Sequence, residues 1–182
     1  MKYGIPICFA LFLSAQAQAF SLQGTAWERI ANDHGLDGNL LYAIALVESA
    51  KLADKTSARP TPLALHVPDG AVYPDSHGAA MDIIDSFRHA PKSIDIGIMQ
   101  INAGWHGQRV GSLEDLLDMN TNIRVAAEIL SEAIRSAPGD IELGVGRYHN
   151  WNEPISRKYG RRVISVWSRL NMLADAKHGG AL

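Results

Sequence analysis

Glu48 is a carboxylic acid on the apolar side of a predicted helix. It follows Leu41 by seven residues, Ile44 by four and Ala45 by three, and at 3.6 residues per turn these positions form one stripe. Because an isolated carboxylate is costly to bury, its pKa rises and the acid keeps its proton near neutral pH. Such an acid can protonate the leaving oxygen of a glycosidic bond. The spacing leaves a second interpretation open, an ordinary ion pair with Lys51 at i+3.

Glu48 has no obvious catalytic partner in the sequence. The best second carboxylate is Asp95, next to a glycine turn, although capping or bracing that turn suits it equally well. Asp54, Asp82 and Asp85 have the settings of ordinary solvated or capping residues. The seven histidines are scattered without the spacing of metal ligands, and the glycines of residues 104–111 lack the lysine and the preceding strand of a nucleotide-binding loop. We therefore expect neither a metal nor another cofactor.

Helical periodicity dominates the chain that must position Glu48. A capping box at Thr25 begins a helix that stops at Gly35, and Asp37 caps the helix that carries Glu48. Further helices are predicted from Ser76 to Pro91, over 112–117, over 121–135, from Asp140 to about Tyr148, and from Ser156 to Ala176. Two short strands, 63–67 and 71–73, flank the turn residues Pro68-Asp69-Gly70. The pattern predicts a mainly α fold with a small β-hairpin.

The N-terminal segment, residues 1–19, has the features of a signal peptide. Lys2 is followed by an apolar stretch from Ile5 to Leu13, and Ala17-Gln18-Ala19 fits the rule for cleavage after Ala19. The stretch is too short to remain as a membrane-spanning anchor. We expect an exported, periplasmic protein without a stable membrane anchor. Its only cysteine, Cys8, lies in this segment, so no disulfide is expected in the mature chain.

The rest of the chain has the composition of one globular domain. Of 182 residues, 47% are hydrophobic and 20% are charged, which is enough apolar material for a single core. A formal net charge of −2 argues against nucleic acid as a partner. Arg157, Lys158, Arg161 and Arg162 share one side of a predicted helix. The simpler interpretation is a solvated outer face, and a grip on an acidic polymer is secondary.

Three motifs occur in an order that resembles the lysozyme-like, soluble-type lytic transglycosylases. They are Val47-Glu48-Ser49, then Asp95-Ile-Gly-Ile-Met-Gln-Ile-Asn102, then Gly146-Arg-Tyr-His-Asn150. The chain is most similar to the small specialised members that accompany conjugation and secretion machines. The resemblance implies the goose-lysozyme type of fold for the domain, which we place at residues 20–176. Residues 177–182 have little to anchor them and are expected to form a flexible tail. It also implies peptidoglycan as the substrate, and possible partners among the components of such a machine.

The resemblance assigns roles to individual residues. Glu48 would be the single acid/base, and Ser49 would orient its carboxyl or contact the substrate. Gly97 would let the backbone approach a sugar closely, and Met99 would form an apolar floor. Gln100 and Asn102 would offer amide hydrogen bonds, and Tyr148 would bring its hydroxyl near Glu48. Many relatives have asparagine directly after the tyrosine, so either His149 or Asn150 takes that role here. Outside the family pattern, all of these positions also suit turn, core or packed surface residues.

The implied reaction cleaves the bond between N-acetylmuramic acid and N-acetylglucosamine and forms a 1,6-anhydro ring. One acid suffices, because the attacking hydroxyl belongs to the sugar itself, whereas most glycosidases need two carboxylates. Two alternatives stay open: a lysozyme-like muramidase that uses water, with Asp95 or an aspartate from the 60–90 insertion assisting, and an inactive peptidoglycan-binding assembly factor. Gly97 follows Glu48 by 49 positions (97 − 48), and this stretch holds an insertion at residues 60–90. It is expected either to extend one wall of the substrate groove or to be a passive surface addition.

Overall fold

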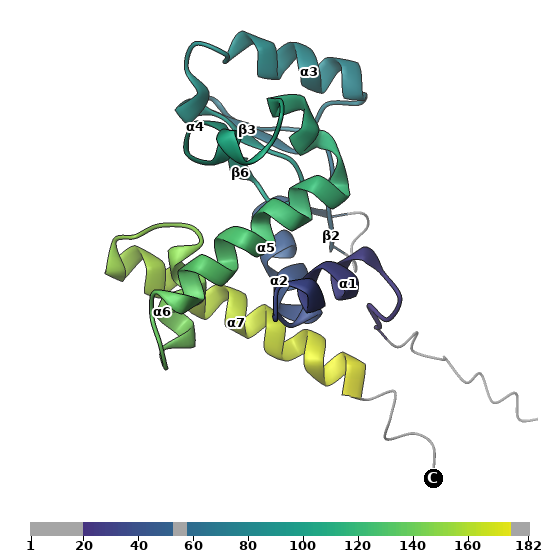
Figure 1. The fold of residues 1–182 in the computed structure, drawn as a ribbon. Helices are drawn as coiled ribbons and strands as arrows, with labels where there is room; N and C mark the ends of the chain where they lie inside the picture. The colour runs from purple at the N-terminus through teal and green to yellow at the C-terminus, as the bar shows by residue number, and fades with distance from the viewer. Residues whose placement is uncertain (1–19, 53–57, 176–182) are drawn as a thin grey trace, which may run out of the picture.

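The computed structural model of the protein describes residues 20–52 and 58–175. The predicted signal peptide and the predicted tail lie outside the described residues. The described part contains seven α-helices and a small antiparallel sheet (Figure 1). The helices are α1 (Ala26–Asp33), α2 (Gly38–Ser49), α3 (His77–Ser86), α4 (Ala103–His106), α5 (Met119–Arg135), α6 (Ile141–Arg147) and α7 (Glu153–Asp175). Short 3-10 turns, η1 (Pro91–Ser93), η2 (Gly107–Arg109) and η3 (Leu113–Leu117), complete the helical segments.

The sheet is larger than the single predicted hairpin. Its four strands lie in the order β4-β3-β5-β6, with β3 (Leu65–Val67), β4 (Gly70–Val72), β5 (Asp95–Ile96) and β6 (Ile101–Asn102). The predicted hairpin is confirmed as β3–β4, with Val67 paired opposite Gly70. The segment around Gly97 was predicted only as a glycine-rich stretch, but β5 pairs there with both β3 and β6. A separate pair, β1 (Ala50–Leu52) and β2 (Ala58–Pro60), follows α2.

Most helix starts are determined by side-chain caps that the sequence predicts. Thr25, Asp37, Ser76 and Asp140 each accept a backbone N–H bond from the first turn of α1, α2, α3 and α6. The boundaries differ at three helices. Asp118 caps α5, which therefore begins before Thr121. Helix α7 begins at Glu153, not Ser156, because proline is tolerated in a first helical turn. Helix α3 ends at Ser86, several residues before Pro91.

Two helices, α2 and α5, form the centre of the apolar core. The predicted stripe of α2 is buried, with Leu41, Ile44 and Ala45 fully inaccessible to solvent. The inward side chains of α5, including Ile123 and Leu130, are equally buried. In Figure 1, α5 runs between the sheet with α3 and α4 at one end and the other four helices at the opposite end. The end of α2 therefore lies where the two parts of the fold meet.

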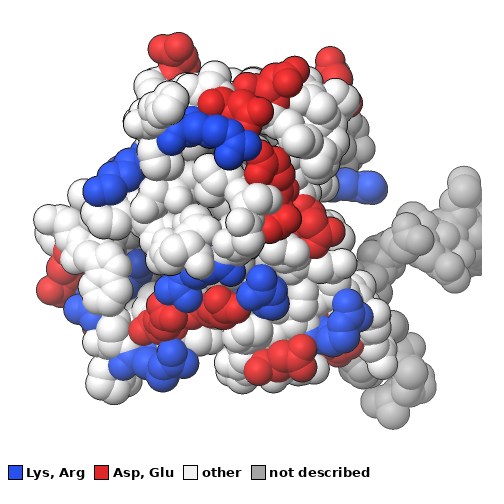
Figure 2. Space-filling model, turned by 45° about the horizontal axis from the view of Figure 1, so that its top comes forward, with Lys and Arg blue, Asp and Glu red and all other residues white. Residues whose placement is uncertain are grey.

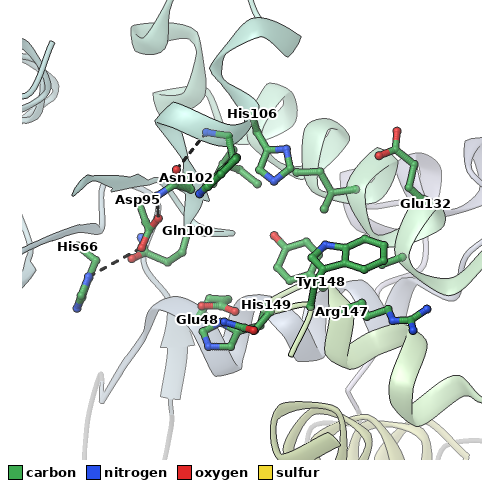
Figure 3. Close-up of a pocket in the computed structure, with 16 residues that line it drawn as sticks. Glu48, His66, Asp95, Gln100, Asn102, His106, Glu132, Arg147, Tyr148 and His149 are labelled. Atoms are coloured by element: carbon green, nitrogen blue, oxygen red, sulfur yellow. Dashed lines mark hydrogen bonds and ion pairs between the residues drawn. The ribbon is translucent and has the colours of Figure 1, made fainter. Parts of the chain in front are cut away.

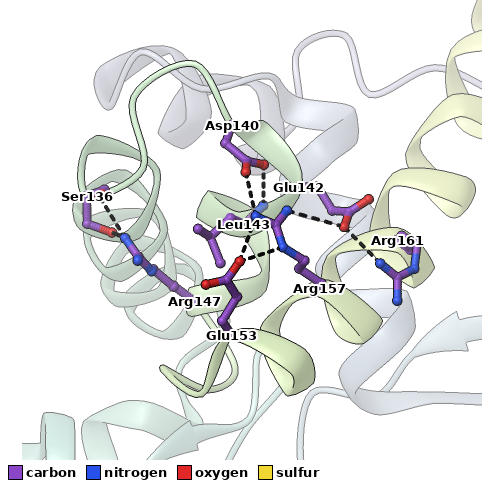
Figure 4. A network of polar contacts seen from close by, with 8 residues as sticks. All are labelled: Ser136, Asp140, Glu142, Leu143, Arg147, Glu153, Arg157 and Arg161. Carbon is purple, nitrogen blue, oxygen red and sulfur yellow. Dashed lines mark hydrogen bonds and ion pairs between the residues drawn. The ribbon is translucent and has the colours of Figure 1, made fainter.

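Helices α6 and α7 approach each other backbone to backbone. A Cβ atom on Gly146 would collide with the backbone of Ser156, and one on Gly160 would collide with the carbonyl of Glu142. A polar network holds the same two helices together (Figure 4). Arg157 of α7 forms ion pairs with Asp140 and Glu142 at the start of α6. Part of the basic cluster expected to face solvent is thus engaged with acids of the neighbouring helix.

Candidate active site

Glu48 lies near the C-terminal end of α2 and is half-buried. The Tyr159 hydroxyl, on α7, donates a hydrogen bond of 2.5 Å to its Oε1. Among the described residues Glu48 forms no ion pair, and the Lys51 ammonium lies 5.1 Å from the ring centre of Tyr73. The ordinary i+3 ion pair with Lys51 is therefore not formed.

The surroundings of Glu48 favour the protonated acid. Burial is the largest effect, and with the nearby charge of Asp95 it outweighs the opposing effects of the Tyr159 hydrogen bond and the charge of Arg162. Together they raise the pKa of Glu48 to about 7. A carboxyl group with this pKa holds its proton in a large part of the molecules at neutral pH and can also give it up. It can therefore serve as both acid and base.

The Glu48 carboxyl opens onto a pocket of about 790 Å³ (Figure 3). Side chains from the sheet, from α4 and α5, and from the loop after α6 line it. They are Glu48, His66, Asp95, Gln100, Ile101, Asn102, Trp105, His106, Ile129, Glu132, Ala133, Arg147, Tyr148, His149, Asn150 and Trp151. In Figure 3, Glu48, Asp95 and His66 lie on one side, and Arg147 and Glu132 lie on the other. The pocket is therefore elongated, as an extended ligand would require.

Six of the nine predicted site residues line this pocket: Glu48, Gln100, Asn102, Tyr148, His149 and Asn150. The other three, Ser49, Gly97 and Met99, do not. Ser49 is only 1% exposed. Its hydroxyl donates to the Ile98 carbonyl at 2.7 Å and accepts from the Thr61 amide at 3.2 Å. Ser49 thus ties the end of α2 to the strands.

Gly97 and Met99 lie in the turn between β5 and β6, behind the pocket wall. Gly97 has φ +81°, and a Cβ there would lie 2.6 Å from the Leu116 carbonyl and collide with the Asn122 side chain. The close approach that this glycine permits is therefore to protein groups. Met99 is fully buried, and its amide donates to Asn122 Oδ1 at 2.8 Å. The turn ends at Gln100, whose φ of 51° is unusual for a residue with a side chain.

Asn122 of α5 holds this turn in place from below. Its Nδ2 donates to the carbonyls of Ile96 and Leu116 at 2.9 and 2.8 Å, while its Oδ1 accepts from Met99. Gln100 Nε2 adds a bond of 2.8 Å to the Gly97 carbonyl within the turn. The turn presents Gln100 and the strand ends to the pocket, and the buried Asn122 amide ties it to β5 and η3. Asn122 carries no mark in the sequence that distinguishes it from an ordinary helix residue.

Two tyrosines lie near Glu48, Tyr148 at the end of α6 and Tyr159 in α7, and their hydroxyls form hydrogen bonds with different groups. The Tyr148 hydroxyl, predicted to approach Glu48, donates to the Met99 carbonyl at 2.8 Å. The hydroxyl that donates a hydrogen bond to the Glu48 carboxyl is that of Tyr159. His149 stacks flat on Tyr159, with ring centres 4.7 Å apart and an interplanar angle of 6°. The sequence placed Tyr159 only on the inward stripe of its helix, and nothing in its spacing pointed to Glu48.

Asp95 is the second carboxylate of the pocket. Asn102 Nδ2 donates to it at 2.8 Å, and His66 Nδ1 lies 3.9 Å from its other oxygen. Burial raises the pKa of Asp95, while the Asn102 bond and the charges of His66 and His149 act in the opposite direction. His66 belongs to the 60–90 segment, so this segment contributes a side chain to the pocket.

Residues 20–52 and 58–175 contain no group of three or more potential metal ligands. None of the helices in this part of the chain is long and apolar enough to cross a membrane. On the face shown in Figure 2, basic and acidic side chains lie close to one another around a region that carries neither.

Tyr159→Phe is expected to raise the pKa of Glu48 above about 7, because the lost hydroxyl bond favours the ionised carboxylate. A carbon-13 NMR titration of the Glu48 carboxyl measures this directly. The matched control is Tyr148→Phe, which removes a hydroxyl that bonds the Met99 carbonyl and should leave the pKa of Glu48 nearly unchanged. An unchanged or lower pKa in Tyr159→Phe would contradict the assignment of Tyr159 as the partner of Glu48.

One comparison with known proteins gives a match. A family model described as Transglycosylase SLT domain matches residues 25–162, which include every residue that lines the pocket. The chain has no match among curated proteins or among solved structures.

Proposed function

The chain belongs to the transglycosylase SLT domain family, and on that premise we propose that it cleaves peptidoglycan glycan strands with Glu48 as the single acid/base. The family supports lytic transglycosylase activity on peptidoglycan, and the mainly helical fold with its small sheet is of the lysozyme-like kind. The observation that carries the assignment to Glu48 is its place in the elongated pocket, where burial raises its pKa to about 7. No other glutamate in the described chain combines these features.

In the first step, protonated Glu48 donates its proton to the oxygen that links C1 of N-acetylmuramic acid to the next sugar. The C1–O bond breaks, and the departing sugar leaves with a free hydroxyl. Positive charge develops on the muramic acid ring, next to a carboxylate that has just become negative. The Tyr159 hydroxyl stabilises this carboxylate by the bond it already donates.

In the second step, the Glu48 carboxylate removes the proton from the 6-hydroxyl of the same muramic acid. The 6-oxygen attacks C1 and closes the 1,6-anhydro ring, and Glu48 is again protonated. Water is not consumed. Because nucleophile and electrophile belong to one sugar, the step needs only the correct ring conformation. Holding that conformation is the role we propose for the polar side chains that line the pocket near Glu48, namely Gln100, Asn102, His149 and Asn150.

In this proposal, Ser49, Gly97 and Met99 lie behind the residues that line the pocket and support them. Ser49 and Met99 anchor α2 and Tyr148 to the β5–β6 turn, and Gly97 allows that turn to lie against η3. We expect these residues to position the groove and make no direct contact with sugar, which revises the roles that the family pattern implied for them.

We also propose where the enzyme acts and which proteins it acts with. Residues 1–19 would direct export and be removed after Ala19, so that the enzyme meets peptidoglycan in the periplasm, where enzymes of this family typically act. Local opening of the wall for a conjugation or secretion machine follows from the resemblance of the three motifs to the specialised members. A binding test between the purified protein and purified periplasmic components of such a machine checks this part separately.

Mass spectrometry of the products tests the reaction. Purified sacculi are digested with the protein, and the released fragments are expected to carry the 1,6-anhydro end, one water lighter than hydrolysis products. Fragments with an ordinary reducing end would identify a hydrolase. Absence of any product from folded protein would favour a peptidoglycan-binding factor.

One observation favours hydrolysis as the second candidate function. Asp95 lies in the same pocket as Glu48 and raises the pKa of Glu48 by its charge, so it has the position of a second carboxylate that could activate water. Under the transglycosylase proposal, Asp95→Asn keeps the anhydro products, with a rate change within about tenfold. Under the hydrolase alternative, this variant loses its products. Product mass and release rate from sacculi separate the two outcomes.

A further inference from the structure

The most exposed aromatic side chains of the described residues both lie in the pocket. Trp151 is 66% exposed and Trp105 is 62% exposed. Among the described phenylalanines, tyrosines and tryptophans only Tyr73 is also exposed, at 38%, and it lies outside the pocket. Exposed tryptophan is an unusual use of a large apolar side chain. The family motifs and the mechanism above leave Trp151 without a role.

Trp151 lies at the end of the pocket away from Glu48. It follows α6 by four residues and lies beside Arg147, which lines the same pocket. Figure 3 shows Arg147 and Glu132 on the far side of Tyr148 from Glu48, His66 and Asp95. A ligand that reaches both Glu48 and Trp151 must therefore be extended along the pocket.

Trp151 is held in place although it is exposed. The Arg147 guanidinium carbon lies 5.2 Å from its ring centre, a cation–π distance. Arg147 is itself fixed by bonds from Nη1 to the Ser136 carbonyl at 2.6 Å and hydroxyl at 2.9 Å. The loop is bonded on both sides of the indole: Asn150 Oδ1 accepts from the Asn152 amide at 2.8 Å, and the Asn150 carbonyl accepts from the Ser156 hydroxyl.

A fixed, exposed indole is suited to one kind of ligand surface. The axial hydrogens of a hexopyranose ring form a flat apolar face, which stacks on an aromatic ring, while the equatorial hydroxyl and N-acetyl groups project to the sides. The Arg147 guanidinium lies over the indole ring, so a sugar would stack on the opposite face. Because the indole is already oriented, little conformational entropy is lost on binding.

We propose that Trp151, oriented by Arg147, is a stacking platform for an N-acetylhexosamine ring of the glycan strand at a distance from the bond that Glu48 cleaves. The identity of the ligand rests on the proposed function. The platform binds substrate and takes no part in proton transfer, so it would determine how long a strand the enzyme grips.

The test uses the four tryptophans of the chain as reporters, in Glu48→Gln protein so that the ligand is not cleaved. The chitin hexamer of β-1,4-linked N-acetylglucosamine is titrated into nitrogen-15-labelled protein, and the indole N–H resonances are followed by NMR. Trp151 is expected to shift. Trp27, which is buried, and Trp167, whose indole donates to Asp37 outside the pocket, serve as internal controls and are expected to stay in place. Trp105 reports occupancy of the wall at α4.

Affinity provides the second readout. Trp151→Ala in the same background is expected to weaken hexamer binding about tenfold, which corresponds to about 1.4 kcal/mol, and Trp151→Phe should recover part of the loss. An unshifted Trp151 resonance, or a Trp151→Ala variant that binds as tightly as its parent, overturns the platform. Product release from sacculi by the enzyme with intact Glu48 is measured separately. If products are released but the Trp151 indole resonance does not shift, only the platform is overturned. If the Trp151 resonance shifts but no product is released, the platform is supported and the proposed function is contradicted.

Discussion

Glu48→Gln is expected to reduce the release of anhydro fragments from sacculi by about 10²–10⁴-fold, the range for loss of a general acid–base group. Glutamine has nearly the same shape but can neither donate the proton to the glycosidic oxygen nor accept one from the 6-hydroxyl. The matched control is Glu153→Gln, which changes an exposed glutamate outside the pocket and should retain the activity of the unmodified protein. Full activity in folded Glu48→Gln protein would contradict the mechanism.

The same variant is expected to change how stability depends on pH. The pKa of Glu48 is about 7 in the folded protein and near its ordinary value of 4.5 when unfolded, so the folded state binds the proton more tightly. Its contribution to stability is complete below about pH 4.5 and is lost as the pH rises through about 7. Glu48→Gln does not lose this stability at high pH, because glutamine does not ionise. The variant should exceed the unmodified protein in the free energy of unfolding by up to a few kcal/mol at pH 8. Urea unfolding at pH 5 and pH 8 measures the difference.

Asn122→Ala is expected to destabilise the protein by about 3 kcal/mol or more, because it leaves three buried backbone groups without partners. Asn122 is 1% exposed, and its bonds to Met99, Ile96 and Leu116 lie away from solvent. For a chain of this size the loss corresponds to a fall in Tm of about 10 °C. Thermal unfolding followed by circular dichroism measures it.

Asn120→Ala is the matched control for Asn122→Ala, since it removes an exposed asparagine from the same helix and should change the free energy of unfolding by no more than about 0.5 kcal/mol. Because Asn122 also fixes the turn that carries Gln100, its loss should lower activity even below the melting temperature. A Tm equal to that of Asn120→Ala would contradict the role given to the buried amide.

Local sequence determined the helical elements and the place of the catalytic acid within one of them. Caps such as Thr25, Asp37 and Asp140 predict helix starts because their side chains bond backbone amides only two or three residues away. The position of Glu48 in an apolar stripe likewise follows from the period of a single helix. The ordered motifs also indicated the family and six of the sixteen residues that line the pocket.

Only the tertiary structure decided which groups meet at Glu48. Tyr159 is 111 positions away in the chain, and its hydroxyl reaches the carboxyl because α7 packs against α2. The β5–β6 turn was not recognisable as part of a sheet, since two-residue strands carry no periodicity and exist only through their pairing. Nothing in the sequence distinguishes Trp151 from an ordinary aromatic residue in a loop. Local patterns report bonds within a few residues, whereas the partner of a buried carboxyl is determined by how separate helices pack.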